Sequence, residues 1–169
     1  MKSCDSENVF VINADVPLIE DSIIDLMVTK HIQSSAAATL LTADLSDPKR
    51  LGKIIRDQDG TVKEVVEVAS ESDVKESSIT EINGGVYCFN KNILETYLCE
   101  VEKSKSGEVY LTDVIKLLSG KRRLIETIRL KNIEGVTFGI DSNIDLELGN
   151  SVLRDKILDQ LMMQGVTVE

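Results

Sequence analysis

The stretch from Val9 to Leu18 narrows the choice of fold more than any other part of this sequence. Val9 to Ile12 are β-branched or aromatic and favour a fully buried strand, whereas Pro17 has no backbone N–H and cannot continue a central strand. Asp15 is therefore expected just beyond the carboxyl end of that strand. Ligands of open α/β sheets bind beyond such ends. Asp15 is thus either a carboxylate that faces a metal ion or polyphosphate, or part of an Asx-turn that ends the strand.

The next two segments predict a strand–helix–strand unit. Glu20 to Ile32 carries apolar residues at helical spacing, and Ala36 to Leu45 is a second apolar run that favours a buried strand. The right-handed crossover rule makes the two strands of such a unit parallel, which predicts an α/β protein. His31 is the only histidine and has no evident carboxylate, serine or cysteine partner. We expect it on the surface at the helix end, without a catalytic role.

The remaining sequence predicts a hairpin and several further elements. Lys53–Arg56 and Thr61–Val66 flank a polar loop that ends in Gly60, which is typical of a β-hairpin. The pair Gly84 and Gly85 either forms a β-bulge or leaves Asn83 facing a ligand. Other expected elements are strands at 82–89, 124–130 and 136–140, helices at 92–101, 114–118 and 143–164, and a surface loop or short helix at 69–78.

Charge and cysteine content exclude several classes of protein. The 169 residues suffice for one domain, and the formal net charge of −10 disfavours binding to nucleic acid or an anionic membrane, which needs clustered Lys and Arg. If the substrates are phosphates, a cation must mediate their binding to this acidic chain. Cys4, Cys88 and Cys99 lack metal-ligand spacing and are expected as reduced packing residues. Neither a signal-peptide pattern nor an apolar run of about 18 residues occurs, which predicts a soluble, cytoplasmic protein.

Motifs of several enzyme classes do not occur in the sequence. There is no G-x-G-x-x-G and no G-x-x-x-x-G-K-S/T, so no glycine-rich loop of these kinds holds a triphosphate. The sequence also lacks a Cys/His zinc pattern, a G-x-S-x-G motif, sustained heptads and internal repeats. Two strands that each end at an aspartate, Asp15 and Asp141, remain as the informative pattern.

Six short segments, taken together and in order, resemble one family. In sequence and approximate spacing they resemble the N-acetylglucosamine-1-phosphate uridylyltransferase family, in particular the uridylyltransferase domain of its bifunctional members. Residues 161–167 resemble the point where the arm helix of those enzymes meets a left-handed β-helix domain. The six segments are Asn13–Leu18, Leu51–Ile54, Val65–Glu67, Glu81–Gly85, Gly107–Asp113 and Gly139–Asp141.

The resemblance implies a fold and a reaction. The fold is a Rossmann-like α/β fold of the nucleotide-diphospho-sugar transferase type, with a mixed, mostly parallel sheet and a C-terminal connector helix. In the reaction, a phosphate oxygen of N-acetylglucosamine 1-phosphate attacks the α-phosphorus of UTP, which gives UDP-N-acetylglucosamine and pyrophosphate with Mg²⁺ as cofactor. Asp15 matches the family's metal-binding aspartate, and Asp141 stands where the family has an asparagine. Both are implied as catalytic and metal-binding residues, since Mg²⁺ prefers oxygen ligands.

The resemblance also implies a sugar pocket. Gly52 would let the backbone approach the sugar, Glu67 would accept hydroxyl groups, and Asn83 would donate a hydrogen bond through its amide. Thr112 is explained almost equally well as a helix N-cap. The identity of the sugar is left open, because Asn13 replaces a tyrosine that is frequent in the family and Gly84 replaces a threonine, and each change alters what the pocket can hydrogen-bond. Lys53 replaces an arginine of the family and keeps its charge without the bidentate geometry. The implied substrate-binding residues are Asn13, Ala14, Gly52, Glu67, Asn83, Tyr110 and Thr112.

The family's first strand, its glycine-rich loop and its uracil-binding residues have no counterpart in this sequence. We therefore expect an N-terminally truncated, partial nucleotidyltransferase domain at 1–142, an arm helix at 143–169 that leads towards an absent β-helix domain, and little turnover. One alternative is a non-catalytic sugar-phosphate-binding or assembly module that needs a separate chain for the nucleotide half. Another is a relative that activates a different sugar or alcohol phosphate. The unpaired apolar edge left by a missing strand predicts a marginal monomer or a homo-oligomer.

Overall fold

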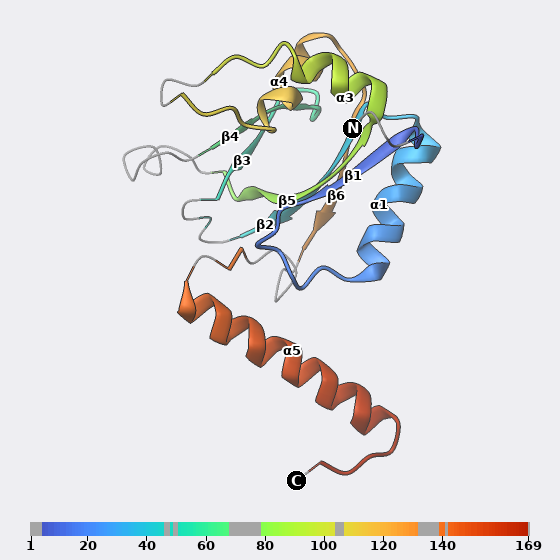
Figure 1. Ribbon diagram of the computed structural model, residues 1–169, viewed down its shortest axis with the longest axis vertical. Helices are drawn as coiled ribbons and strands as arrows, with labels where there is room; N and C mark the ends of the chain where they lie inside the picture. Colours follow the sequence, from blue (N-terminus) through green and yellow to red (C-terminus); the bar gives the residue numbers. More distant parts are fainter. Residues whose placement is uncertain are drawn as a thin grey trace.

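The structure is a computed structural model that describes residues 5–45, 48, 51–67, 79–103, 107–131, 139, 140 and 142–168. It combines a mixed sheet with helices on both faces of that sheet and a long helix at the C-terminal end (Figure 1). The strands are β1 (Asn8–Ile12), β2 (Ala38–Asp44), β3 (Lys53–Arg56), β4 (Val62–Val66), β5 (Glu81–Asn90) and β6 (Ile125–Leu130). The helices are α1 (Asp21–Ser34), α3 (Lys91–Leu98), α4 (Asp113–Gly120) and α5 (Asn143–Met163).

Strand β5 organises the sheet, whose strand order is β4-β3-β5-β2-β6, with β1 paired to β5 beside that path. Strands β1 and β2 both run antiparallel to β5, so they are parallel to each other, as the crossover rule predicts, but they are not neighbours. The expected mixed α/β sheet is confirmed. The expectation of mostly parallel pairing is wrong for the described strands, because only β2 and β6 pair in parallel. β5 runs in the opposite direction to β1 and β2 and lies between them, although the sequence suggested that β1 and β2 would be adjacent.

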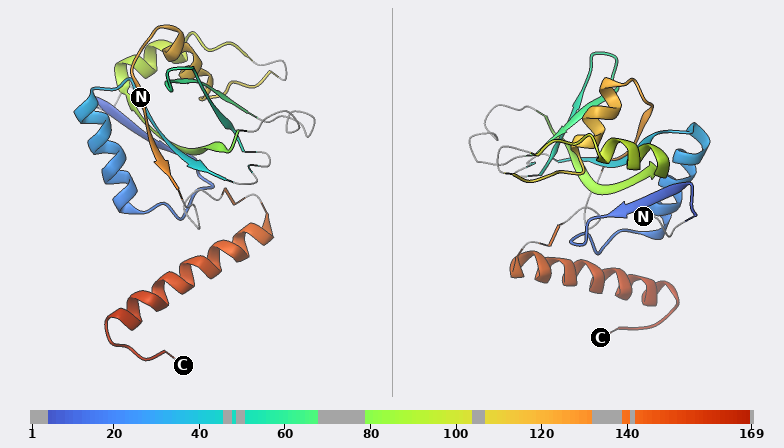
Figure 2. Two further views of the ribbon diagram at one scale, coloured as in Figure 1. Left: turned by 180° about the vertical axis from the view of Figure 1, so that it is seen from behind. Right: turned by 45° about the horizontal axis from the view of Figure 1, so that its top comes forward.

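Two helical layers cover the sheet on opposite faces (Figures 1 and 2). Successive side chains of a strand point to opposite faces, so Leu41 packs with Met27 of α1, while Leu40 packs with Leu118 of α4. Both leucines are fully buried. Strand β2 is therefore a core strand, which explains why it has apolar residues on both faces instead of alternating apolar and exposed polar ones.

The opening strand is less buried than its sequence suggests. Residues Asn8 to Val11 of β1 are partly exposed and Ile12 is exposed, because within the described residues β1 pairs only with β5. The expectation of a fully buried strand is thus wrong, since burial depends on neighbours that an apolar run does not specify. Asp15 lies just past the carboxyl end of β1, as expected.

His31 is buried, which contradicts the expected surface position. Its Nδ1 lies 2.9 Å from Thr39 Oγ1 and its Nε2 lies 3.2 Å from Asn8 Oδ1, so the ring connects α1 with β2 and β1. Burial lowers the pKa of His31 below its ordinary value. His31 is therefore a buried polar residue whose hydrogen bonds join three elements of the fold. That it has no catalytic role stays a prediction.

The two cysteines within the described residues differ in environment. Cys88 of β5 is buried, and burial raises the pKa of its thiol to about 11, which fits the expected reduced packing residue. Cys99 is exposed at the end of α3, so the packing role expected for it is wrong. Cys4 lies outside the described residues.

The hairpin of β3 and β4 and the start of helix α5 form where the sequence predicts them. The hairpin of β3 and β4 turns through 57–60, with Gly60 at φ +85°, and Asp57 N–H donates to the Thr61 carbonyl at 2.9 Å. Helix α5 starts after Ser142, whose Oγ accepts the N–H of Asp145, which is an N-cap bond. The segment 69–78 and most of the expected strand 136–140 lie outside the described residues.

Helix α5 projects from the body of the molecule in both views of Figure 2. Gly149 is its buried residue, and a Cβ added there would lie 3.4 Å from Ile140 Cδ1. Lys156 pairs with Glu20 at 2.7 Å, which fixes the helix to the segment before α1. No helix in the described part of the chain is both long and apolar enough to span a membrane.

Candidate functional site

A cavity of about 270 Å³ lies where two strands meet the same edge of β5. Strand β1 pairs with the second half of β5, from Val86 to Asn90, and β3 pairs with its first half at Ile82. The end of β1 and the start of β3 leave a gap beside Asn83, Gly84 and Gly85. The lining residues are Asn13, Val16, Leu51, Gly52, Glu67, Asn83, Gly84, Gly85, Tyr87, Tyr110, Leu111, Thr112 and Gly139.

Strand β5 bulges at this gap. Leu40 pairs with Tyr87 and Thr42 pairs with Asn83, so three residues of β5 lie opposite the single residue Leu41. Gly85 has φ +67°, a conformation that favours glycine, and a Cβ at Gly85 would lie only 2.7 Å from Asn13 Nδ2. The glycine pair therefore lies in a β-bulge, which confirms the first alternative raised by the sequence, and Asn83 beside it lines the cavity.

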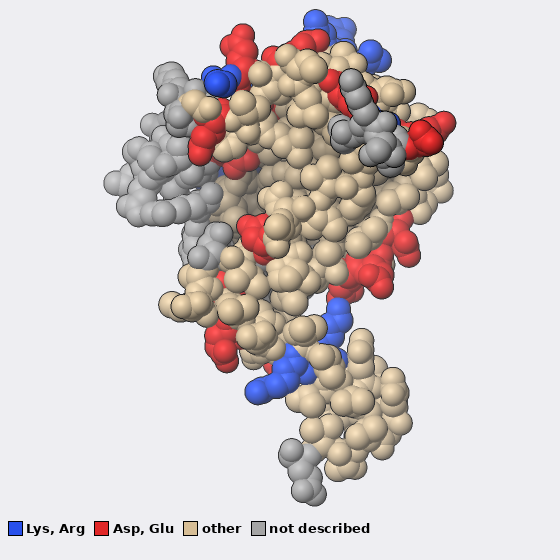
Figure 3. All heavy atoms as spheres, in the orientation of Figure 1, with Lys and Arg blue, Asp and Glu red and all other residues tan. Residues whose placement is uncertain are grey.

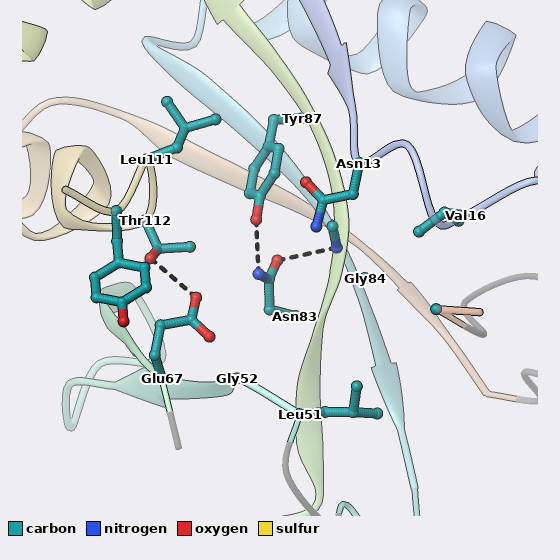
Figure 4. A pocket seen from close by; sticks show the side chains of 13 residues that line it. Asn13, Val16, Leu51, Gly52, Glu67, Asn83, Gly84, Tyr87, Leu111 and Thr112 are labelled. Atoms are coloured by element: carbon teal, nitrogen blue, oxygen red, sulfur yellow. Dashed lines mark hydrogen bonds between the residues drawn. The ribbon is translucent and has the colours of Figure 1, made fainter. Parts of the chain in front are cut away.

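Asn83 is held in one orientation by hydrogen bonds at both ends of its amide (Figure 4). Its Nδ2 donates to the Tyr87 hydroxyl at 2.6 Å, and its Oδ1 accepts the N–H of Gly85 at 3.3 Å. Burial, helped by the negative charge of Glu67, raises the pKa of Tyr87 to about 12 against the opposing effect of Asn83. Tyr87 thus stays a neutral hydroxyl that can accept from Asn83 and donate into the cavity.

Glu67, Gly52 and Thr112 form the opposite wall. A Cβ at Gly52 would lie 2.9 Å from Glu67 Oε2, so the absence of a side chain lets this carboxylate rest against the backbone. Thr112 Oγ1 donates to Glu67 Oε1 at 3.0 Å (Figure 4). Thr112 is the residue before α4, but its side chain makes no capping hydrogen bond. The N-cap explanation of Thr112 therefore fails, and its hydroxyl serves the cavity wall.

The other implied substrate-binding residues divide into two groups. Asn13 and Tyr110 line the cavity, and the Tyr110 hydroxyl donates to Glu108. Asn13 N–H donates to the Gly85 carbonyl at 2.9 Å, which fixes the end of β1 to the bulge. Ala14 lies exposed in the turn after β1 and is not among the lining residues.

Asp15 borders the cavity through Gly139. A Cβ at Gly139 would lie 2.8 Å from Asp15 Oδ2, and Ile140 N–H donates to the Asp15 carbonyl at 2.9 Å. The segment that leads to Asp141 therefore lies directly against Asp15, while Asp141 itself is outside the described residues. Within the described ranges, no three His, Cys, Asp or Glu side chains form a metal-binding group. An Asp15 carboxylate beside a close backbone approach fits one oxygen ligand of Mg²⁺.

Sequence reasoning missed several lining residues. Tyr87 is separated from Asn83 by the bulge in β5, and the regular alternation of side chains along a strand does not predict which residues share a face across such a bulge. Leu51 and Leu111 each stand beside a residue that was identified, but apolar side chains carry no chemical signal of their own. Val16 stands between Asp15 and Pro17, and its apolar side chain likewise gives no chemical sign of a place in the cavity wall.

The chain belongs to the nucleotidyl transferase family, because the sequence profile of that family matches residues 2–132. Among curated proteins it is similar to the bifunctional protein GlmU of Carboxydothermus hydrogenoformans, with 36% identity over 99% of this chain and 37% of the relative. It is also 35% identical, over 95% of its length, to GlmU of Acetivibrio thermocellus, and covers 34% of that protein. The chain thus spans little more than a third of the length of these relatives.

Solved structures confirm the fold. An apo UDP-glucose pyrophosphorylase has a TM-score of 0.67 and 18% identity over 90% of this chain and 56% of that protein. A CMP:2-keto-3-deoxy-manno-octonic acid synthetase complexed with CTP has a TM-score of 0.65 and 12% identity over 92% of this chain and 65% of that protein. At these identities the likeness establishes the nucleotidyltransferase fold alone.

Proposed function

We propose that this chain provides the sugar-phosphate side of a nucleotidyltransferase site that makes UDP-N-acetylglucosamine and pyrophosphate from UTP and N-acetylglucosamine 1-phosphate. One observation carries the proposal. In a member of the nucleotidyl transferase family, an amide, a carboxylate and two hydroxyls converge on a small cavity that borders an aspartate at a strand end. Ligand sites of α/β sheets lie at such strand ends.

The cavity suits the uncharged part of a sugar phosphate. Its volume of about 270 Å³ is at the lower end of the range for ligand pockets, roughly 300–1,000 Å³, and fits a monosaccharide better than a whole nucleotide. Glu67 keeps lone pairs beyond the bond from Thr112 and would accept sugar hydroxyls. Tyr87 holds Asn83 in place, so the amide would meet the sugar without first being ordered.

In the proposed reaction a phosphate oxygen of the sugar phosphate forms a bond to the α-phosphorus of UTP while the bond to the pyrophosphate oxygen breaks. The attacking phosphate is already an anion, so the chain needs no nucleophile and no general base. Its residues would orient the sugar and hold the phosphate in line. Asp15 would hold Mg²⁺, with Asp141 as a second oxygen ligand, and the bound ion would offset the repulsion between the two anions.

The wider setting is part of the same proposal. We place the partial nucleotidyltransferase domain at 1–142, the arm helix at 143–169 and the protein in the cytoplasm. The relatives are much longer than this chain, so the nucleotide half of the site would come from residues beyond it, in the same protein or in a partner chain. Under this proposal the chain can bind the sugar phosphate without catalysing its reaction with UTP, so binding and turnover each need an experiment.

Isothermal titration with N-acetylglucosamine 1-phosphate, with and without Mg²⁺, tests the binding half. We expect saturable binding that weakens about tenfold in Glu67→Gln, because a charged acceptor is lost. Glu64→Gln is the matched control, since Glu64 is on β4, the strand that Glu67 follows, but it is not a lining residue and pairs with Lys116. Asp15→Asn should abolish only the Mg²⁺-dependent part. Absence of binding, or equal binding by Glu67→Gln, would overturn the sugar pocket.

Pyrophosphate release from UTP in the presence of the sugar phosphate tests the other half. Release by this chain alone would mean that it holds the nucleotide by itself. Sugar-phosphate binding without release is the expected result and supports a half-site. Glucose 1-phosphate in place of N-acetylglucosamine 1-phosphate tests the identity of the sugar, and tighter binding of glucose 1-phosphate would refute that assignment.

A further inference from the structure

A second cavity, of about 600 Å³, lies at the other end of the same two elements that build the first cavity. Helix α4 begins after Thr112 in the first cavity and ends at Gly120 in the second. Strand β4 begins with Val62 in the second cavity and is followed by Glu67 in the first. The two cavities are therefore separate, with the length of α4 between them.

One wall of the second cavity is basic. Arg122 and Arg123, in the loop after α4, are both exposed and line the cavity. Neither has an ion-pair partner in the described part of the chain, whereas Arg56 and Arg129 pair with Glu81 and Asp44. In a chain of net charge −10, two adjacent guanidinium groups without a carboxylate partner are available to an anion. In the space-filling view, basic and acidic side chains lie close together at the top of the molecule (Figure 3).

Arg122 occupies a backbone position that favours another residue. It has φ +53°, the left-handed conformation in which α4 ends and for which glycine is the usual choice. Its N–H donates to the Ser119 carbonyl at 2.8 Å, so the turn is a regular helix end that glycine could form equally well. Arg122 therefore places a charged side chain beside the cavity at a backbone conformation that glycine adopts with less strain.

The wall formed by the hairpin loop is acidic. Asp57 and Asp59 lie in the hairpin loop, where Asp59 Oδ1 accepts from both the N–H and the hydroxyl of Thr61. These bonds keep the pKa of Asp59 below its ordinary value, so the carboxylate stays charged. Arg56 donates to the Gly60 carbonyl at 2.9 Å and anchors the loop to β3. These hydrogen bonds hold the Asp59 carboxylate beside Thr61, and both residues line the cavity.

We propose that the second cavity is a binding site for a phosphorylated polyol, a small molecule with a phosphate group at one end and hydroxyls at the other. The two arginines match the phosphate, and the free lone pairs of the aspartates match the hydroxyls. Leu124, which is about half exposed, provides apolar surface for a ring in the cavity. A sugar phosphate and a nucleoside monophosphate share this chemistry.

Amide NMR of the complete chain, at constant ionic strength, tests the proposal with inorganic phosphate, glucose 6-phosphate and AMP as probes. Gly60 and Gly120 border the two walls and report on the cavity. We expect both amides to shift in a saturable way with glucose 6-phosphate or AMP, and more weakly with inorganic phosphate. The tighter binding of glucose 6-phosphate or of AMP tells whether the ligand is a sugar phosphate or a nucleoside monophosphate. Equal affinity for inorganic phosphate would overturn the role of the acidic wall.

Two variants separate binding from folding. Arg122→Gly should weaken the binding of glucose 6-phosphate or AMP about tenfold, because one guanidinium group is lost. The urea midpoint of unfolding should stay equal or rise, since glycine adopts the left-handed turn without strain. Arg154→Ser removes the same charge from α5 and should leave the affinity unchanged. Asn83→Ala in the first cavity should also have no effect, which distinguishes this site from the sugar pocket. Wild-type affinity in Arg122→Gly, or no shift at Gly60 and Gly120, would refute the site.

Discussion

Replacement of Gly85 by alanine tests how the bulge in β5 forms the candidate site. Two costs add at this position. The φ of +67° imposes roughly 1–2 kcal/mol on any residue with a Cβ. The new Cβ would also lie 2.7 Å from Nδ2 and 3.0 Å from Cγ of Asn13, and such overpacking costs about 1–3 kcal/mol. We therefore expect Gly85→Ala to lower the free energy of unfolding by roughly 2–5 kcal/mol.

Two further variants separate these costs. Gly60 has φ +85° and open space around it, so Gly60→Ala should cost only the backbone part, about 1–2 kcal/mol. Asn13→Ala keeps the backbone bond to Gly85 and removes the clashing atoms, so adding it to Gly85→Ala should recover about 1 kcal/mol or more.

Urea unfolding followed by circular dichroism measures all four proteins, with the m-value as a check that each unfolds in the same way. The reasoning is refuted if Gly85→Ala costs no more than Gly60→Ala, or if Asn13→Ala brings no relief. Asn13 must move when Gly85 gains a side chain, so Gly85→Ala should also weaken N-acetylglucosamine 1-phosphate binding by the proposed sugar pocket.

Three other changes give independent tests. Glu81 is buried and accepts two bonds from Arg56. Burial by itself would raise the pKa of Glu81, but the hydrogen bonds and charge of Arg56, together with smaller contributions from Thr42 and Arg129, keep that pKa below its ordinary value. Glu81→Gln should cost about 2–3 kcal/mol in urea unfolding, less than a fully buried pair because Arg56 is partly exposed. As a comparison, Lys30→Ala breaks a surface pair and should cost under about 1 kcal/mol. The pKa of His31 is lower in the folded than in the unfolded chain, so stability should fall as pH drops below about 6.5, and the slope between pH 7 and 5.5 should be smaller in His31→Gln. Tyr87→Phe should cost roughly 0.5–1.5 kcal/mol and weaken sugar-phosphate binding in calorimetry, because Asn83 loses its acceptor; unchanged binding would show that Asn83 needs no support.

Local patterns in the sequence predicted the elements that local forces determine. The hairpin around Gly60 and the start of α5 at Asn143 follow from turn residues and a capping serine that act within a few residues. The direction of β5 was not predictable in the same way, because an apolar strand has the same pattern whichever way it runs. Its antiparallel entry between β1 and β2 is decided by the rest of the sheet.

The candidate site shows the same division. Gly52 and Glu67 were expected as separate pocket residues, but only the structure shows that the missing side chain of Gly52 makes room for the Glu67 carboxylate. Thr112 could equally have capped α4, and packing across 45 residues of sequence decides that it bonds to Glu67 instead. His31 was misjudged because its partners, Thr39 and Asn8, come from two other elements. Contacts between distant segments are therefore what sequence reasoning lacked.

The position of the Thr112–Glu67 bond makes the sugar pocket depend on how α4 packs on β4. Glu67 directly follows β4 and Thr112 directly precedes α4, and the Lys116–Glu64 pair at 2.8 Å joins the same two elements one helical turn further along. The second cavity opens between the other ends of α4 and β4. A ligand that fixes Arg122 against the hairpin loop would thus stabilise the packing that holds the cavity wall in place. The two cavities therefore share α4 and β4, and the bonds between these elements lie between the two cavities.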